Sequence, residues 1–240
     1  MAKTLRGGLT PSDADGSVAV TPLECGYAPK NSLQRQLRSV LPDASVIILN
    51  GEQGTGKTGG AIGEGLLALL RPDSGIRKLM VTRPSVSRGS RLGFMPGDLL
   101  EKMAPWLASV NDAMEGFSNA TIAKLGGRVE VVSLEHIQGR TVRNAWLVVD
   151  EAENLWDRAE IIDVVTRVGP GGKVFLAGNP PQSRLPHAPN PFGEFIVDHH
   201  RTPGVAVITA TRDDQLRSPG FLKTFLEIEE KIQRRRSSRR

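Results

Sequence analysis

A glycine-rich run from Gly51 to Thr58 constrains the fold most, because it follows a β-branched stretch and precedes a helical one. Its residues fit the phosphate-binding loop pattern of glycine, four residues, glycine, lysine and a hydroxyl residue. Glycines let backbone N–H groups converge on phosphate oxygens, and the N-terminus of the following helix favours negative charge. Lys57 is expected to reach the β- and γ-phosphates and Thr58 to ligate Mg²⁺. The expected nucleotide-binding residues are Gly51, Glu52, Gln53, Gly54, Thr55, Gly56, Lys57 and Thr58.

Six short apolar runs rich in β-branched residues alternate with helical stretches. This alternation predicts an α/β fold with a mainly parallel sheet covered by helices on both faces. Ligands of such sheets bind beyond the carboxyl ends of the strands. Strands are expected at 45–49, 78–82, 128–133, 145–149, 173–177 and 205–209, and helices at about 57–70, 97–115, 157–167 and 219–235.

Charge is concentrated at the end of the chain. Of 31 basic residues, against 26 acidic ones, five are arginines within residues 233–240. This basic tail is expected either to bind nucleic-acid phosphates by counterion release or only to aid solubility. The remaining organisation is expected to be a flexible arm over residues 1–30, rich in glycine and proline, and a domain over 31–232 that contains the phosphate-binding loop.

The chain has no apolar run of the roughly 20 residues that a membrane helix requires, and no secretory signal at its start. We therefore expect a cytoplasmic protein without a membrane partner. Its single cysteine, Cys25, can form no internal disulfide.

A second half of the phosphate site is expected where the apolar run 145–149 ends in Asp150 and Glu151. Asp150 would hold Mg²⁺ through water, and Glu151 would polarise an attacking water molecule, which makes the site hydrolytic. The alternative is that both acids only cap the following helix. Gln182, in a proline-rich loop after the next strand, would sense the γ-phosphate or serve only as a loop amide.

These motifs resemble the PhoH-like family of P-loop ATPases, a branch similar to the first ATPase lobe of superfamily 1 helicases. The resemblance covers roughly residues 30 to 230. It implies that residues 31–232 form a single RecA-like P-loop NTPase domain with ATPase activity. It also implies that ATP and Mg²⁺ are the ligands, that Gln34 recognises adenine and that the chain forms a hexameric ring. The segments that carry it are Thr82-Arg83-Pro84, Leu92 to Lys102, Gly139-Arg140-Thr141, Asp150 to Asn154, and Leu216-Arg217-Ser218-Pro219.

Three positions depart from the family pattern. Glu153 stands where the family usually has glutamine, Asn179 where it usually has aspartate, and Ser218 where it usually has histidine. The first two changes exchange a carboxylate and an amide, so they bear on Mg²⁺ binding and γ-phosphate sensing. The third bears on the role of Arg217.

A single ATPase lobe leaves the γ-phosphate exposed, and an arginine supplied by another subunit is worth roughly 10³ to 10⁵ in rate. We therefore expect a closed homo-oligomer. Arg217, Arg83 and Arg140 are candidates for this arginine, for nucleic-acid contacts, or for ordinary salt bridges. The expected activity is ATP hydrolysis coupled to single-stranded RNA or DNA. Alternatives are a P-loop phosphotransferase, a non-hydrolysing nucleotide-gated scaffold and a DNA-packaging motor.

Overall fold

The computed structural model describes residues 26–84, 110–113, 115, 118, 121, 124–137, 139–186, 188–217 and separate positions between 220 and 231. Most of the expected arm, the resemblance segment from Leu92 to Lys102, most of the expected helix at 97–115, Ser218, Pro219 and the basic tail lie outside the described residues.

A six-stranded sheet forms the centre of the molecule, and all of its pairings are parallel. The order is β3-β2-β4-β5-β1-β6, so β5 lies between β1 and β4. The α/β fold predicted from the sequence is confirmed, as are all six strands. Their bounds are β1 Val46–Asn50, β2 Lys78–Thr82, β3 Val129–Val131, β4 Ala145–Val149, β5 Lys173–Gly178 and β6 Val205–Thr209.

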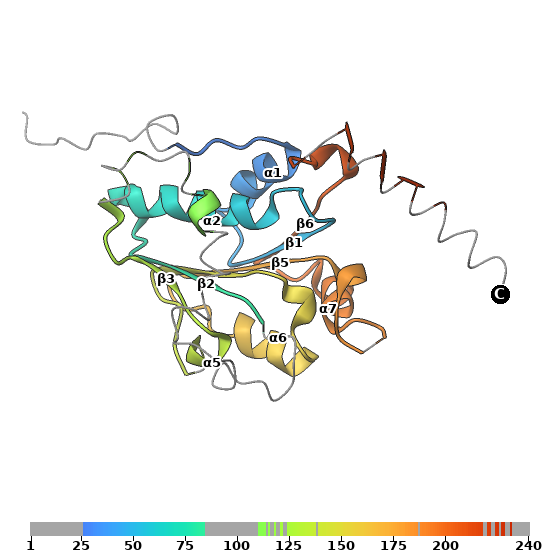
Figure 1. The fold of residues 1–240 in the computed structure, drawn as a ribbon. Coiled ribbons are helices and arrows are strands. Elements are labelled where there is room, and N and C mark those ends of the chain that lie inside the picture. The colour runs from blue at the N-terminus through green and yellow to red at the C-terminus, as the bar shows by residue number, and fades with distance from the viewer. Residues whose placement is uncertain are drawn as a thin grey trace, which may run out of the picture.

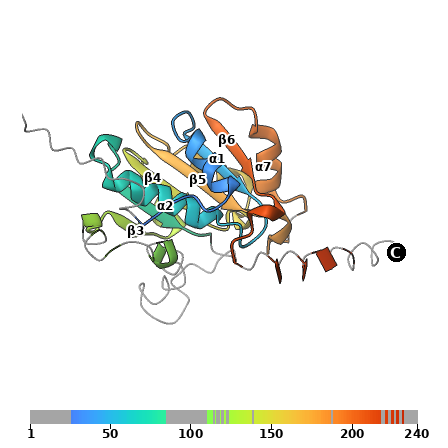
Figure 2. The same ribbon diagram turned by 90° about the horizontal axis from the view of Figure 1, so that it is seen from above.

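Helices cover both faces of the sheet (Figure 1). On one face lie α1 (Ser32–Val40) and α2 (Lys57–Leu70), which run side by side across the strands in Figure 2. On the other lie α5 (Leu134–Ile137), α6 (Arg158–Val165) and α7 (Pro191–His199). Within the described part of the chain, four short 3₁₀ turns join the elements: η1 Pro72–Ser74, η3 Ala152–Asn154, η4 Pro180–Gln182 and η5 Arg212–Asp214.

Each face has its own apolar core. Leu66 of α2 and Phe175 of β5 belong to the core on one side, and Phe192 of α7 and Leu176 of β5 belong to the core on the other. All four side chains are fully buried. Because β4 and β5 are covered on both faces, their sequences read as continuous apolar runs rather than alternating ones.

The sequence pattern does not predict α1 or α7. Both helices have only nine residues. In α7, which begins at Pro191, the glycine at position 193 lowers the intrinsic helix propensity. Each begins instead at an asparagine cap: Asn31 accepts a hydrogen bond from Gln34 N, and Asn190 accepts one from Gly193 N.

Residues 26–30, at the end of the expected arm, lie against the domain. Tyr27 is buried and packs on α2 at Gly63, where any Cβ would lie 2.3 Å from the tyrosine ring. Within the described residues, no helix has the length and apolar character needed to cross a bilayer.

Candidate nucleotide site

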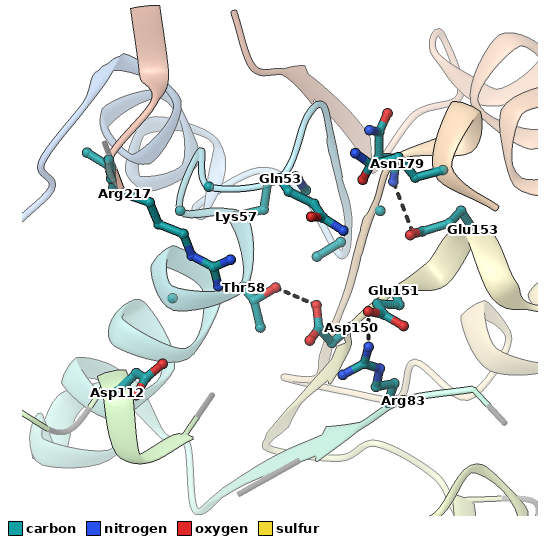
Figure 3. A pocket seen from close by; sticks show the side chains of 17 residues that line it. Gln53, Lys57, Thr58, Arg83, Asp112, Asp150, Glu151, Glu153, Asn179 and Arg217 are labelled. Atoms are coloured by element: carbon teal, nitrogen blue, oxygen red, sulfur yellow. Dashed lines mark hydrogen bonds and ion pairs between the residues drawn. The ribbon is translucent and has the colours of Figure 1, made fainter. Parts of the chain in front are cut away.

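A polar pocket of about 450 Å³ opens where β1, β4 and β5 end (Figure 3), a volume within the range of small-molecule sites. Because all strands are parallel, the loops after these three strands meet at one edge of the sheet. The pocket is lined by Gln53, Gly54, Gly56, Lys57, Thr58, Gly59, Arg83, Asp112, Asp150, Glu151, Glu153, Ala177, Gly178, Asn179, Gln182, Leu216 and Arg217.

The phosphate-binding loop is held from its outer side through its backbone carbonyl groups. Gln53 O accepts from Gln215 Nε2 at 2.9 Å, and Gly54 O from Leu216 N at 2.8 Å. In a planar trans peptide the next residue's N–H points away from the carbonyl, so these bonds direct N–H groups towards the pocket. The same pattern continues at the next two carbonyls, where Thr55 O accepts from Asn31 Nδ2 at 2.9 Å and Gly56 O from Gln34 Nε2 at 3.0 Å.

Gly56 caps α2 in the left-handed conformation, with φ of +75°. A Cβ at this position would lie 2.6 Å from Leu216 Cδ1 and 2.7 Å from Gln34 Nε2. Any side chain would therefore meet both backbone strain and a packed neighbour, which explains why the loop needs glycine here.

The side chain of Lys57, the first residue of α2, reaches back to the start of the loop. Its Nζ donates to Gly51 O at 2.6 Å and to Glu52 O at 2.7 Å. Burial lowers the pKa of Lys57, whereas the nearby carboxylates of Glu153 and Asp150 oppose the decrease. The ammonium group is thus held at the pocket by carbonyl oxygens that a phosphate oxygen would replace as partner.

Thr58 and Asp150 meet across the pocket. Thr58 Oγ1 donates to Asp150 Oδ1 at 2.5 Å, although the two residues are 92 positions apart. The loop after β1 and the acidic end of β4 therefore lie together, as the sequence predicts. A hydroxyl and a carboxylate oxygen are ligands that suit Mg²⁺, which binds proteins through one or two carboxylates plus substrate phosphates. This pair fits such an ion.

Glu151 follows Asp150 in the left-handed region, with φ of +52°, which is uncommon for a residue other than glycine. Its carboxylate forms an ion pair with Arg83, the residue after β2. Asn154 Nδ2 also donates to Glu151 Oε2, at 3.4 Å. The carboxylate is thereby held at the pocket between two donors.

Glu153 is a further carboxylate of the pocket, beside Asp150 and Glu151, and is only 5% exposed. Its Oε2 accepts from Asn179 N at 3.0 Å, which fixes the end of η3 against the end of β5. Burial raises the pKa of Glu153, whereas hydrogen bonds from backbone N–H groups and the charge of Lys57 act in the opposite direction.

The predicted site residues divide into two groups. Lys57, Thr58, Asp150, Glu151, Gln182 and Arg217 all line the pocket, and Arg217 points into it towards Thr58 (Figure 3). The arginine therefore places its charge in the site of its own chain.

Gln34, Gly51, Glu52 and Thr55 do not line the pocket. Both ends of the Gln34 side-chain amide form hydrogen bonds with the backbone: Oε1 accepts from Lys30 N, and Nε2 donates to Gly56 O. The Thr55 hydroxyl donates to Glu52 O. Arg140 also lies outside the pocket, where its Nη1 is 3.9 Å from Oε2 of Glu130 in β3.

Sequence reasoning missed two features of the site. Asp112 lines the pocket, but no motif marks it, because it belongs to a different part of the chain from the loop and the acidic strand. The bond between Asn31 and the loop was also missed, although Asn31 followed three residues later by Gln34 resembles a helix-capping pattern.

Among the described residues, no group of three or more histidine, cysteine, aspartate or glutamate side chains is arranged to hold a metal ion. A Mg²⁺ site built from Thr58, Asp150 and a nucleotide needs no such group.

Curated relatives cover about two thirds of this chain. Protein PhoH2 of Bacillus subtilis (strain 168) is 37% identical over 173 residues, which is 68% of this chain and 38% of that protein. A PhoH-like protein of Synechocystis sp. is 38% identical over 161 residues, which is 66% of this chain and 48% of that protein. This chain thus spans less than half the length of either relative.

Among solved structures, the large terminase from a thermophilic bacteriophage superposes with a TM-score of 0.52 at 13% identity, over 80% of this chain and 48% of that one. Identity this low supports the shared RecA-like P-loop fold alone. A family model described as PhoH-like protein matches residues 27–228, so the chain belongs to the PhoH-like family of P-loop NTPases.

Proposed function

We propose that this protein is a Mg²⁺-dependent ATPase. The observation that supports this most is the 2.5 Å contact between Thr58 Oγ1 and Asp150 Oδ1, with Glu151 next in the chain and Lys57 before Thr58. One pocket thereby combines phosphate-binding N–H groups, a cation, oxygen ligands for a metal and a carboxylate for proton transfer.

The charged and hydroxyl residues at the centre of the pocket have separate roles in this proposal. The loop and Lys57 bind the β- and γ-phosphates, and Thr58 and Asp150 hold Mg²⁺, which when bound would neutralise charge on the phosphate oxygens. Glu151 accepts a proton from water as the water oxygen attacks the γ-phosphorus and the bond to the β-phosphate oxygen breaks. The products are ADP and inorganic phosphate.

We assign roles to three further residues. Gln182 senses the γ-phosphate from the rim of the pocket. Arg217 stabilises charge on the γ-phosphate from within its own chain, which changes the expected source of that charge. Gln34 recognises adenine only after its amide leaves the bond to Gly56 O.

We also propose that hydrolysis is coupled to single-stranded RNA or DNA in a homo-oligomeric ring. The support is the family membership and the arginine excess of residues 233–240. Arg140, whose side chain is 51% exposed and outside the pocket, is the candidate among the three arginines that can reach another copy.

Phosphate release tests the enzymatic part. Purified full chain is assayed with ATP and Mg²⁺, with EDTA as metal-free control, and products are separated by thin-layer chromatography. When the γ-phosphate of ATP carries the label, labelled free phosphate supports hydrolysis, whereas label transferred to an acceptor molecule would identify a phosphotransferase. Lys57→Ala should abolish turnover, and Lys124, an exposed lysine outside the pocket, supplies the matched control Lys124→Ala. Nucleotide binding without turnover in the wild type would instead indicate a scaffold.

Solution mass and nucleic-acid response test the second part. Sedimentation with and without ATP and Mg²⁺ measures the oligomer, and the ATPase rate is compared with and without single-stranded RNA or DNA at low salt. A monomer with undiminished turnover would contradict the ring. A rate that ignores both nucleic acids would contradict the coupling.

A further inference from the structure

Asn31 joins three parts of the molecule through one side chain. Its Oδ1 accepts from Gln34 N at 3.0 Å and so caps α1. Its Nδ2 donates to Thr55 O of the phosphate-binding loop at 2.9 Å and to Asp214 O of η5 at 2.7 Å. The residue is 6% exposed, so each of these bonds is made away from solvent.

Asp214 fastens the same junction from the other side. One carboxylate oxygen accepts from Ser32 Oγ at 2.7 Å and from Leu33 N at 3.0 Å, and the other accepts from Thr211 N at 2.8 Å and Thr211 Oγ1 at 3.0 Å. Burial alone would raise the pKa of Asp214, but these hydrogen bonds lower it below its ordinary value. All four acceptor positions of this buried carboxylate are therefore used: two join α1 to η5, and two fix the start of η5 at its cap, Thr211.

The chain then runs along the loop from Asp214 to Arg217. Gln215 Nε2 donates to Gln53 O, and Leu216 N donates to Gly54 O. The next residue, Arg217, lines the pocket. The backbone that carries this arginine is thus hydrogen-bonded to the backbone that is shaped to bind phosphate. We call residues 31–34 and 211–216 the brace.

We infer that Asn31 is a positioning residue, which through the brace sets the phosphate-binding loop and Arg217 at the spacing that favours a nucleoside triphosphate over a diphosphate. This inference rests on the proposed nucleotide site. In the proposed site the loop and Lys57 would contact the β-phosphate of a diphosphate and a triphosphate alike, whereas Arg217 would contact only the γ-phosphate of a triphosphate. A loosened brace therefore weakens triphosphate binding more than diphosphate binding.

The chemistry of Asn31 makes the inference testable with small substitutions. Asn31→Asp keeps an oxygen that caps α1 but replaces the donor by an acceptor, which then faces the carbonyl oxygens of Thr55 and Asp214. Asn31→Ser replaces the capping amide oxygen by a hydroxyl oxygen, which also caps helices, and it removes the amide donor without adding charge. Both variants keep the cap and break the link to the loop.

The test measures dissociation constants for the non-hydrolysable triphosphate AMPPNP and for ADP, with Mg²⁺, by titration calorimetry on the full chain. The matched control is Asp157→Ser, because Asp157 caps α6 in the same way, accepting from Glu160 N, and does not line the pocket. Thermal melting of every variant separates loss of fold from loss of binding.

We expect both Asn31 variants to weaken AMPPNP about tenfold more than ADP, which corresponds to about 1.4 kcal/mol, while Asp157→Ser leaves the ratio unchanged. An unchanged ratio in folded Asn31→Ser would overturn the inference and leave the ATPase proposal intact. So would an equal change in Asp157→Ser. If the wild type binds neither nucleotide, the proposed function itself fails, and the inference falls with it.

Discussion

Arg83 and Glu151 form an ion pair at the edge of the pocket, although they follow different strands, β2 and β4. Because these strands are neighbours in the sheet, the two residues leave it side by side. The pair gives the carboxylate that we assign to water activation a fixed position before any substrate binds. It also means that the guanidinium group must share Glu151 with the attacking water during turnover.

The role of Glu151 is tested by Glu151→Gln, which keeps the shape of the side chain but removes its basicity. We expect the turnover number to fall by roughly 10² to 10⁴, the usual contribution of a general base, while nucleotide affinity changes little. Steady-state phosphate release and calorimetry measure the two quantities. Glu135→Gln, at an exposed glutamate of α5, is the control, and a loss of less than threefold in Glu151→Gln would contradict the assignment.

The ion pair itself predicts coupling between Arg83 and Glu151. Arg83→Ala should lower the turnover number about tenfold, because Glu151 then loses its main positioning partner. In the double variant Arg83→Ala/Glu151→Gln the rate should equal that of Glu151→Gln alone, since residues that act as a unit are not additive. Single-turnover rates of the four proteins decide this. Additive losses would show that Arg83 acts on the substrate independently of Glu151.

Metal affinity depends on the contact between Thr58 and Asp150. We expect Asp150→Asn to weaken Mg²⁺ binding by roughly 10-fold or more, because the amide oxygen can still accept from the Thr58 hydroxyl but carries no charge to attract the ion. The measurement is the Mg²⁺ concentration that half-saturates fluorescent nucleotide binding. Asp73→Asn, an exposed residue in η1, should behave as the wild type. The same Mg²⁺ midpoint in Asp150→Asn would remove the carboxylate from the metal site.

Local sequence pattern predicts most of the sheet because β4 and β5 are short apolar runs, and it predicts the loop because Gly51 to Thr58 has fixed spacing. The meeting of the loop with Asp150 follows from parallel strand topology alone. These inferences need only neighbours in the chain and the general rule for parallel sheets.

The brace cannot be read from the sequence in this way. Asn31 and Asp214 are bonded across 183 positions, and neither belongs to a recognisable motif for phosphate binding. Likewise, Gln34 has the position of an adenine-binding residue, yet both ends of its side-chain amide are hydrogen-bonded to the backbone. Such pairings depend on how α1 and η5 pack on the loop, which is a property of the tertiary structure.

Glu153 makes the stability of the fold depend on pH. Because burial raises its pKa, the folded state binds the proton more tightly than the unfolded state. The resulting stabilisation is complete below the unfolded pKa, near 4, and is lost as the pH rises through the raised folded pKa. At neutral pH the folded state must therefore keep a charged carboxylate buried, which lowers its free energy of unfolding.

Glu153→Gln should remove this cost, since an amide oxygen can still accept from Asn179 N and carries no charge at any pH. We expect the variant to match the wild type near pH 4 and to exceed its free energy of unfolding by on the order of 1 kcal/mol at pH 7. Urea denaturation between pH 4 and pH 8, without nucleotide or Mg²⁺, measures the difference. Glu135→Gln, at an exposed position, should show no such trend. A difference that stays constant or shrinks as the pH rises would mean that Glu153 is stabilised in its ionised form, because the charge of Lys57 then outweighs the effect of burial.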